Sequence, residues 1–307
     1  MIESLQGPIL VLGASGFIGA NLFKRLLNVR QDVYGTCFSQ YGRLKDMPNV
    51  LEVKDPRYTL CQIVPATVFD LITYGAYSFE EDTDRIYNTN VILKHQLMEQ
   101  LHELGTQCYI HAGSSSEYGE QADGPSEDSP LLANSHYAVS KAATSAMIHY
   151  WGKHRGMRCA NLRLYSVYGP MEDKSRLIPK LVSAALEGTY PALVDKKVSR
   201  DFVYVDDVCD VFVRTATHLP PLMYGHSFNV GTGISTTIGE LANVAKEIFH
   251  IPVDPRFSTM ENRHWDFHGE WRANTSKTYA CLDWKSKIKI GEGLLRYAEW
   301  LKNGLSK

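Results

Sequence analysis

"ILVLGASGFIGANLFKRLL", residues 9–27, decides the fold class of this chain. Its four leading apolar residues predict a buried strand, and the residues at about 18–29 predict an amphipathic helix. Three glycines stand between the two elements. Gly13 permits a tight turn, Gly16 lets the backbone approach a pyrophosphate, and Gly19 allows close packing of helix on strand. The stretch predicts a dinucleotide-binding turn whose helix presents N–H groups to phosphate. The predicted cofactor contacts in it are Gly13, Ser15, Gly16, Phe17, Ile18 and Gly19.

Short apolar runs alternate with longer amphipathic stretches through the first half of the chain. The predicted strands cover 9–12, 32–36, 50–53, 68–73, 107–111 and 159–164. The predicted helices between them cover about 18–29, 84–104 and 137–154. Strands that alternate with helices indicate a parallel sheet covered on both faces. We therefore predict an α/β protein with a Rossmann-type doubly wound parallel sheet.

The second half of the chain has a different texture. Prolines separate shorter predicted helices at about 175–187, 206–217 and 238–249, which indicates a smaller, interleaved α/β lobe. We predict a dinucleotide-binding domain at 1–167, with 198–232 partly returning to it, and a smaller lobe made of 168–197 and 233–307.

Composition and charge exclude several classes of protein. The 307 residues are 44% hydrophobic and 21% charged with a net charge of −2, which is typical of a globular protein and gives no basic surface for nucleic acid. No apolar run has the length of a membrane span, and the start of the chain does not resemble a signal peptide. Six scattered cysteines without a C-x-x-C pair favour reduced thiols and predict no metal site. We expect a cytoplasmic protein.

The stretch after the second predicted strand, "YGTCFSQYGR" (34–43), bears on the choice of cofactor. An NAD site usually places an acid here to bind the ribose hydroxyls, and this stretch has none. Ser39 and Arg43 instead favour a 2′-phosphate, so we predict NADP(H), with NAD as the alternative. Asp55, after the third predicted strand, is either a partner of the adenine amino group or a surface aspartate.

Two stretches carry a predicted catalytic group: "HAGSSSEYG" (111–119) and "YAVSK" (137–141). Tyr137 and Lys141 are one helical turn apart and face the same way. A phenol with a pKa near 10 exchanges protons poorly at neutral pH, but a neighbouring ammonium and a cationic nicotinamide would lower that pKa. Tyr137 would then exchange a proton with a substrate oxygen that a serine hydroxyl holds.

These pieces together resemble an extended short-chain dehydrogenase/reductase, of the NAD-dependent epimerase/dehydratase family that modifies nucleotide sugars. The matching stretches are "GASGFIG", "NTNV", "GSSSEYG", "YAVSK", "LRLYSVYGP", "RLIPKL", "SRDFVYVDDV", "FNVGTG" and "LDW". The resemblance implies that Ser114, Tyr137 and Lys141 are catalytic and that Asn90 holds the conformation near the cofactor. It also implies a homodimer whose interface packs the helices at about 84–104 and 137–154, where small residues allow close approach. These are Ala138, Ala142, Ala143 and Ala146, for which the alternative is a place in the internal core.

Departures from the family narrow the expected reaction. Its 4,6-dehydratases have Asp and Glu where this chain has Ser115 and Ser116, which argues against water elimination. Glu117 is either a substrate contact or a carboxylate buried by its own hydrogen bonds. The turn that contains Tyr74 and Gly75, predicted to contact the cofactor, resembles CDP-paratose and CDP-abequose synthases, which are NADPH-dependent reductases.

A nucleotide diphosphate needs cations, and the arginine fork matches phosphate oxygens. By resemblance, Arg200 and Arg263 approach the diphosphate, and Arg176 is a further cation for it. Ser166 stands where the family often has a substrate-binding Asn. The predicted substrate contacts are Ser115, Ser116, Glu117, Ser166, Arg176, Arg200 and Arg263.

The favoured function is NADP(H)-dependent reduction of the C4 ketone of a 4-keto-deoxy nucleotide sugar. The alternative is a nucleotide-sugar 4-epimerase that holds NAD. A 4,6-dehydratase is disfavoured by the serines at 115 and 116. A binding protein without catalysis is disfavoured because Ser114, Tyr137 and Lys141 are all present.

Overall fold

The computed structural model describes residues 1–38, 42–121, 123–261 and 270–305. The main feature of these residues is a seven-stranded parallel sheet with strand order β10-β6-β5-β4-β1-β2-β3. Its strands are β1 (Ile9–Leu12), β2 (Val33–Cys37), β3 (Val50–Glu52), β4 (Thr67–Asp70), β5 (Cys108–Ser114), β6 (Cys159–Leu164) and β10 (Ser227–Val230). The order reverses between β1 and β4, where doubly wound sheets open a crevice at the carboxyl ends of their strands. The predicted Rossmann-type fold is confirmed.

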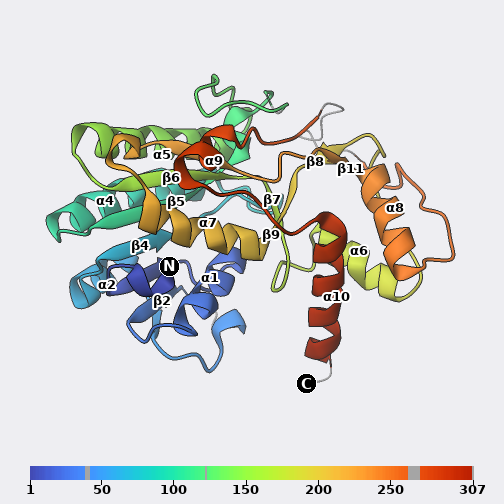
Figure 1. Cartoon of the computed structure of the whole chain (residues 1–307), viewed down its shortest axis with the longest axis horizontal. Coiled ribbons are helices and arrows are strands. Elements are labelled where there is room, and N and C mark those ends of the chain that lie inside the picture. The colour runs from blue at the N-terminus through green and yellow to red at the C-terminus, as the bar shows by residue number, and fades with distance from the viewer. Residues whose placement is uncertain (39–41, 122, 262–269, 306–307) are drawn as a thin grey trace.

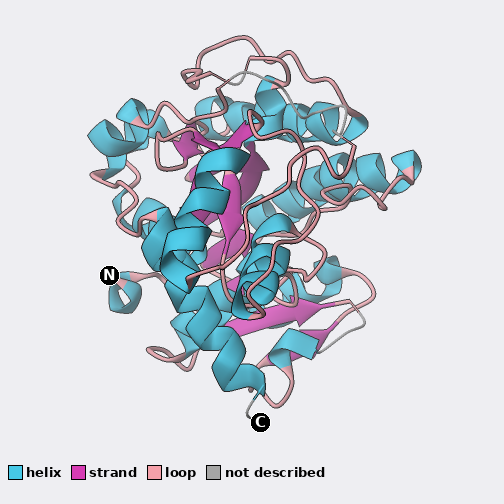
Figure 2. Ribbon diagram, turned by 90° about the vertical axis from the view of Figure 1, so that its right-hand side faces the viewer, coloured by secondary structure: helices cyan, strands magenta, loops and turns pink. Residues whose placement is uncertain are grey.

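Helices cover both faces of this sheet (Figures 1 and 2). Side chains of β1 alternate, so that Ile9 and Val11 join the apolar cluster of α1 (Phe17–Leu27) and α7 (Val205–His218). Leu10 and Leu12 join the cluster on the other face. The helices of that second face are α2 (Pro56–Ile63), α4 (Leu93–Glu103) and α5 (His136–His154). Burial on both faces explains why the strands read as continuous apolar runs.

Two predicted elements differ from the structure. The strand predicted at 68–73 ends at Asp70, because the Asp70 carboxylate accepts the Ile72 N–H (3.1 Å) and turns the chain out of the sheet. The helix predicted at 84–104 has three parts, which are α3 (Thr83–Tyr87), the π-helical turn η3 (Asn88–Ile92) and α4. A π-turn inside a helix redirects side chains, here that of Asn90.

The remaining elements form a group beside the sheet, on the right of Figure 1. Its helices are α6 (Leu177–Leu186), α8 (Ile238–Phe249) and α10 (Ile290–Leu305). Two short strand pairs lie between this group and the sheet: β7 (Ser166–Tyr168) with β9 (Phe202–Tyr204), and β8 (Ser199–Arg200) with β11 (Thr236–Thr237). α9 (Ser276–Leu282) packs beside β10, so late segments return to the sheet. The predicted domain boundaries stay a proposal.

Candidate active site

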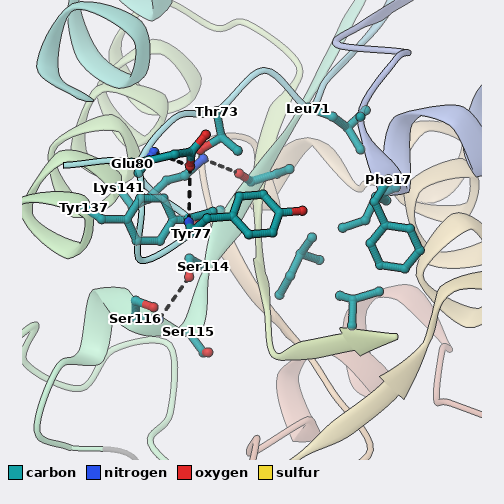
Figure 3. A pocket seen from close by; sticks show the side chains of 18 of the residues that line it. Phe17, Leu71, Thr73, Tyr77, Glu80, Ser114, Ser115, Ser116, Tyr137 and Lys141 are labelled. Atoms are coloured by element: carbon teal, nitrogen blue, oxygen red, sulfur yellow. Dashed lines mark hydrogen bonds between the residues drawn. The ribbon is translucent and has the colours of Figure 1, made fainter. Parts of the chain in front are cut away.

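A cavity of about 730 Å³ opens at the carboxyl ends of the central strands. The glycine turn after β1 lines one side of it, and the end of β5 with the first turns of α5 lines the other (Figure 3). The loop after β4 and the segment after β6 complete the wall. The cavity lies at the reversal of strand order, as expected for a ligand crevice of this fold.

The glycine turn leaves room for a pyrophosphate next to the backbone. Gly13 has a φ of +76°, and a Cβ there would lie 2.9 Å from Ile72 N. A Cβ on Gly19 would lie 2.2 Å from Gly13 O, so only glycine permits this contact of helix and strand. Gly16 is the N-cap of α1 and offers no side-chain cap, so the first N–H groups of the helix have no intrahelical partner. Ser15, Phe17 and Ile18 also line the cavity, and the turn therefore fits a dinucleotide.

Arg43 braces the glycine turn from outside the cavity. Its guanidinium donates to Ser15 O (3.1 Å) and to Met171 O (2.9 Å). Met171 has a left-handed φ of +69° and lies in the loop after β7. Asn21 Nδ2 donates to Pro170 O in the same loop (2.9 Å), so two residues of the sheet domain hold this loop over the turn. The predicted role of Arg43 as a phosphate ligand is not supported by its position.

Asp55 does not line the cavity either. It is the N-cap of α2, where its carboxylate accepts the Arg57 N–H (3.0 Å) and pairs with the Arg57 guanidinium. Asp55 is thus part of a helix cap, and the predicted adenine contact stays a prediction. Ser39 and Arg263, the other two predicted contacts that bear on phosphate, lie outside the described residues.

Ser114, Tyr137 and Lys141 converge on the cavity (Figure 3). Ser114 ends β5, and Tyr137 lies in the first turn of α5, which begins where Ser135 caps the Ala138 N–H (3.1 Å). Lys141, one turn further, is 2% exposed, and its Nζ donates to Ala112 O (2.8 Å). The ammonium lies 5.9 Å from the centre of the Tyr137 ring.

The charge states of Tyr137 and Lys141 depend on burial. Burial raises the pKa of Tyr137, although hydrogen bonds from Ser114 and Thr73 act in the opposite direction. Burial also lowers the pKa of Lys141 to about 7. The net shift of the Tyr137 pKa in the polypeptide by itself is therefore upward, and the predicted lowering by Lys141 together with a cationic nicotinamide stays a prediction. The reason is that a water-poor site disfavours the charged forms of both side chains.

The serine cluster forms a tight 3₁₀ turn, η4 (Ser115–Tyr118), at the end of β5. Ser114 Oγ accepts the Ser116 N–H (3.1 Å), and the Glu117 carboxylate accepts the Ser114 N–H (3.0 Å). This reciprocal capping fixes Ser114 at the mouth of the cavity. Ser115 and Ser116 line the cavity as predicted substrate contacts, and neither provides a carboxyl group.

Glu117 points away from the cavity into the sheet. It is fully buried, and its carboxylate accepts from Arg163 Nε (2.7 Å) and from Asn161 Nδ2 (3.2 Å), both in β6. Of the two sequence-based alternatives, the structure supports a carboxylate buried by its own hydrogen bonds. The prediction that Glu117 contacts the substrate is therefore wrong. Its partners were missed because they lie more than forty residues along the chain.

Asn90 holds the loop that follows β4. Its side chain accepts the Tyr74 N–H (3.0 Å) and donates to Tyr74 O (2.7 Å) and Ser140 Oγ (3.0 Å). Gly75, at φ +94°, lines the cavity, whereas Tyr74 and Asn90 do not. Asn90 therefore acts on the shape of the cavity wall, and the predicted direct contact by Tyr74 is not placed in the cavity.

The predicted substrate residues Ser166, Arg176 and Arg200 all line the cavity. The Arg200 guanidinium lies 5.2 Å from the ring centre of Trp271, which also lines the cavity. Tyr77 also lines the cavity, under the Arg176 guanidinium at 5.6 Å, and its position two residues after Gly75 is a local signal that could have identified it.

Glu172 is a second functional residue that sequence reasoning missed. It lines the cavity, is 8% exposed, and lies 3.8 Å from Arg176 Nε through Oε1. Burial raises the pKa of Glu172 to about 8, and Oε2 has no hydrogen-bond partner in the described part of the chain. One indirect signal in the sequence is that Glu172 lies two residues after the family stretch "LRLYSVYGP" (162–170).

Neither a metal-binding cluster nor a helix that could span a membrane is found among the described residues. No group of three His, Cys, Asp or Glu side chains among them is arranged to hold a metal ion. None of the helices in the described ranges is long and apolar enough to cross a membrane.

Comparison with known proteins places these features in context. The family model described as "NAD dependent epimerase/dehydratase family" matches residues 9–231. A UDP-glucose 4-epimerase of Mycolicibacterium smegmatis is 28% identical over 313 residues, which cover 96% of this chain and 98% of that protein.

Solved structures share the fold over nearly the whole chain. The UDP-glucose 4-epimerase of Thermotoga maritima, solved with UDP-glucose, superposes with a TM-score of 0.86 at 24% identity and covers 97% of this chain and 99% of its own. MoeE5 in complex with UDP-glucuronic acid and NAD has a TM-score of 0.83 at 26% identity, over 97% of this chain and 100% of its own.

Proposed function

The chain belongs to the NAD dependent epimerase/dehydratase family of extended short-chain dehydrogenases/reductases, and we propose that it is a nucleotide-sugar 4-epimerase that holds NAD. One observation carries the proposal. Ser114, Tyr137 and Lys141 meet in the cavity that the glycine turn opens, and Ser115 and Ser116 supply no second acid and base. A 4-epimerase needs one proton-exchanging group that acts twice. Water elimination also needs a second acid and base, which the serines at 115 and 116 do not supply.

The residues of the chain have distinct parts in this reaction. A bound nicotinamide dinucleotide would supply the acceptance and return of hydride at C4. The Tyr137 phenol oxygen would take the proton of the C4 hydroxyl and later give it back. The Ser114 hydroxyl would hold the same substrate oxygen, and the Lys141 ammonium would stabilise the phenolate. Arg176 and Arg200 are the described cavity arginines that match a diphosphate.

The substrate class rests on the relatives as well as on the site. The Mycolicibacterium relative is a UDP-glucose 4-epimerase, and MoeE5 was solved in complex with UDP-glucuronic acid and NAD. We therefore propose a UDP-sugar as the first substrate to test. The finer resemblance to CDP-paratose and CDP-abequose synthases stays a prediction.

A second candidate is the NADPH-dependent reduction of a 4-keto sugar. The observation that favours it is the stretch Thr36-Cys37-Phe38 at the end of β2, which lacks the carboxylate that usually selects NAD. Ser114, Tyr137 and Lys141 would then take part in a single proton transfer, in which Tyr137 gives its proton to the C4 oxygen.

One preparation distinguishes the two functions. Purified protein is denatured, released nucleotides are identified, and fresh protein is incubated with UDP-glucose, UDP-galactose and their dTDP, CDP and GDP counterparts without added cofactor. We expect released NAD and interconversion of a C4 pair. Absence of both, together with oxidation of added NADPH by a 4-keto-6-deoxy nucleotide sugar, would replace the epimerase with the reductase.

A further inference from the structure

A cluster of buried charged groups lies behind the catalytic side chains. The Asp70 carboxylate, at the end of β4, accepts from Lys94 Nζ (2.7 Å), from Tyr109 OH (2.5 Å) and from the Ile72 N–H (3.1 Å). His111 Nδ1 lies 3.2 Å from the same carboxylate. Lys94 comes from α4, and Tyr109 and His111 come from β5, where His111 lies directly beside Asp70 in the register of the sheet and Tyr109 lies beside Val68. We call Asp70, Lys94, Tyr109 and His111 the buried quartet.

Burying the charged groups of the quartet costs free energy of folding. Asp70 and Lys94 are both fully buried, and His111 is 1% exposed. Around them the same face of the sheet is apolar, with Leu10, Leu12 and Val68 among its members. Replacing a buried ion pair by apolar residues of similar volume is often neutral or stabilising, so stability alone does not account for it. Departures of this kind are expected where function requires them.

The quartet adjoins Lys141 without lining the cavity. Lys141 Nζ donates to Ala112 O, and Ala112 follows His111 in β5. Helices α4 and α5 pack side by side on the face that carries the quartet. The charged and titratable groups that act on Lys141 from the surrounding elements are Lys94 of α4, Asp70 of β4, His111 of β5, Glu117 of η4 and Tyr137 of α5.

Lys141 has no carboxylate of its own to balance its charge. Within the described part of the chain it makes no ion pair, and its Nζ donates to a carbonyl oxygen. Its protonation therefore depends on more distant charges. Lys94 disfavours the ammonium, whereas Asp70 favours it. The uncharged state of His111, whose pKa burial lowers to about 4, keeps a third charge away.

We propose that Asp70 and Lys94 are positioning residues for the reaction, because as a buried ion pair they set the charge of the catalytic Lys141 from behind the cavity. The role in turnover rests on the proposed function, but the effect on Lys141 does not. Lys94 Nζ donates to the Asp70 carboxylate, Asp70 supplies a negative charge at the end of β4, and the Ala112 carbonyl accepts from the ammonium of Lys141.

Two substitutions should shift the titration of Lys141 in opposite directions. Lys94→Met removes a positive charge, so the midpoint should rise by about one pH unit. Asp70 keeps Tyr109, Ile72 and His111 as partners in this variant. Asp70→Asn removes the negative charge, so the midpoint should fall. The double variant removes both charges, and its midpoint should lie between the two.

The experiment is an NMR titration of protein labelled with ¹³C at the lysine ε carbons. The signal of Lys141 is the one that Lys141→Met removes, and its wild-type midpoint is expected near pH 7. Tyr109→Phe is the matched control, because it removes a hydrogen bond to Asp70 without changing a charge. The Tyr109→Phe variant should unfold at a lower temperature than the wild type, and its Lys141 titration midpoint should be unchanged.

Each outcome decides the proposal. An unchanged Lys141 midpoint in folded Lys94→Met, or equal shifts in Lys94→Met and Tyr109→Phe, would overturn it. If one single variant does not fold, the other keeps its signed expectation, and the double variant should titrate below Lys94→Met or above Asp70→Asn, whichever of the two folds. In an active enzyme, the high-pH fall of kcat should move with the NMR midpoint. A preparation without epimerase activity would overturn the proposed function and leave the NMR result to judge the quartet.

Discussion

Tyr137 is the residue on which the proposed chemistry depends most. Tyr137→Phe removes the phenol oxygen and should lower kcat by about 10²- to 10⁴-fold, with little effect on binding of the nucleotide sugar. Steady-state kinetics and calorimetric binding measure the two effects. Tyr87→Phe is the control, because its hydroxyl contacts His136 Nδ1 (3.1 Å) at the rim of the site. Wild-type turnover in Tyr137→Phe would remove the catalytic assignment.

Glu172 gives a pH-dependent prediction. Its pKa in the folded chain is raised from 4.5 to about 8 by burial, so the unfolded chain loses this proton at lower pH than the folded chain does. The carboxyl therefore destabilises the fold increasingly as the pH rises from about 4.5 to 8. Glu172→Gln should leave the free energy of unfolding nearly unchanged at pH 4.5 and raise it at pH 8.5. Each unit of pKa difference corresponds to about 1.4 kcal/mol.

Urea unfolding at the two pH values checks this expectation. Glu187→Gln is the matched control, because Glu187 is exposed at the end of α6. A gain of stability at pH 4.5 as large as that at pH 8.5 would show that Glu172 is not held as a buried acid.

Single residues also show which parts of the site could be predicted from the sequence. The glycine turn and the Tyr137–Lys141 pair were predictable, because their spacing acts within one turn of backbone. Asp55 followed by Pro56 is a local cap signal that the sequence reading passed over. The burial of Glu117 depends on its ion pair with Arg163, and the charge on Lys141 depends on Asp70. Only the assembled sheet brings these residues close together.

At the scale of elements, two capping boxes of the same type differ in burial. In η4 the box of Ser114 and Glu117 is buried and tied to β6, whereas in α8 the box of Thr237 and Glu240 is exposed. Glu117→Ala leaves the Arg163 guanidinium buried without its carboxylate, so we expect a loss of about 3–5 kcal/mol in the free energy of unfolding. Glu240→Ala should cost about 1 kcal/mol. Chemical unfolding of both variants tests the difference, and equal losses would contradict it.

Elements were predicted well where apolar runs are long and poorly where structure depends on contacts. The strands at 9–12 and 159–164 match β1 and β6 in full. The break of the helix at 84–104 was missed, because the turn at Asn88–Ile92 follows from side-chain bonds of Asn90 to Tyr74 and Ser140. α2 and α9 were also missed, since their eight and seven residues give too few turns for a clear period.

At the scale of the whole molecule, the predicted homodimer remains to be tested. The outer faces of η3 and α5 expose Ile92 (49%), Val139 (42%) and Tyr150 (49%), which is the kind of apolar surface that a second copy covers. We expect a dimer by light scattering, and a monomer for Tyr150→Asp. Tyr279→Asp, on exposed α9, is the matched control and should stay dimeric. A monomeric wild-type protein would contradict the prediction.

The bracing of the loop after β7 has a kinetic consequence for the whole molecule. Asn21 and Arg43 bond to Pro170 and Met171, which are more than 120 residues away along the chain. Because Arg43 also bonds to Ser15 O in the glycine turn, these contacts fix the shape of the turn against the loop after β7. We expect Arg43→Ala to speed the release of a dinucleotide bound at the turn, which stopped-flow displacement would measure.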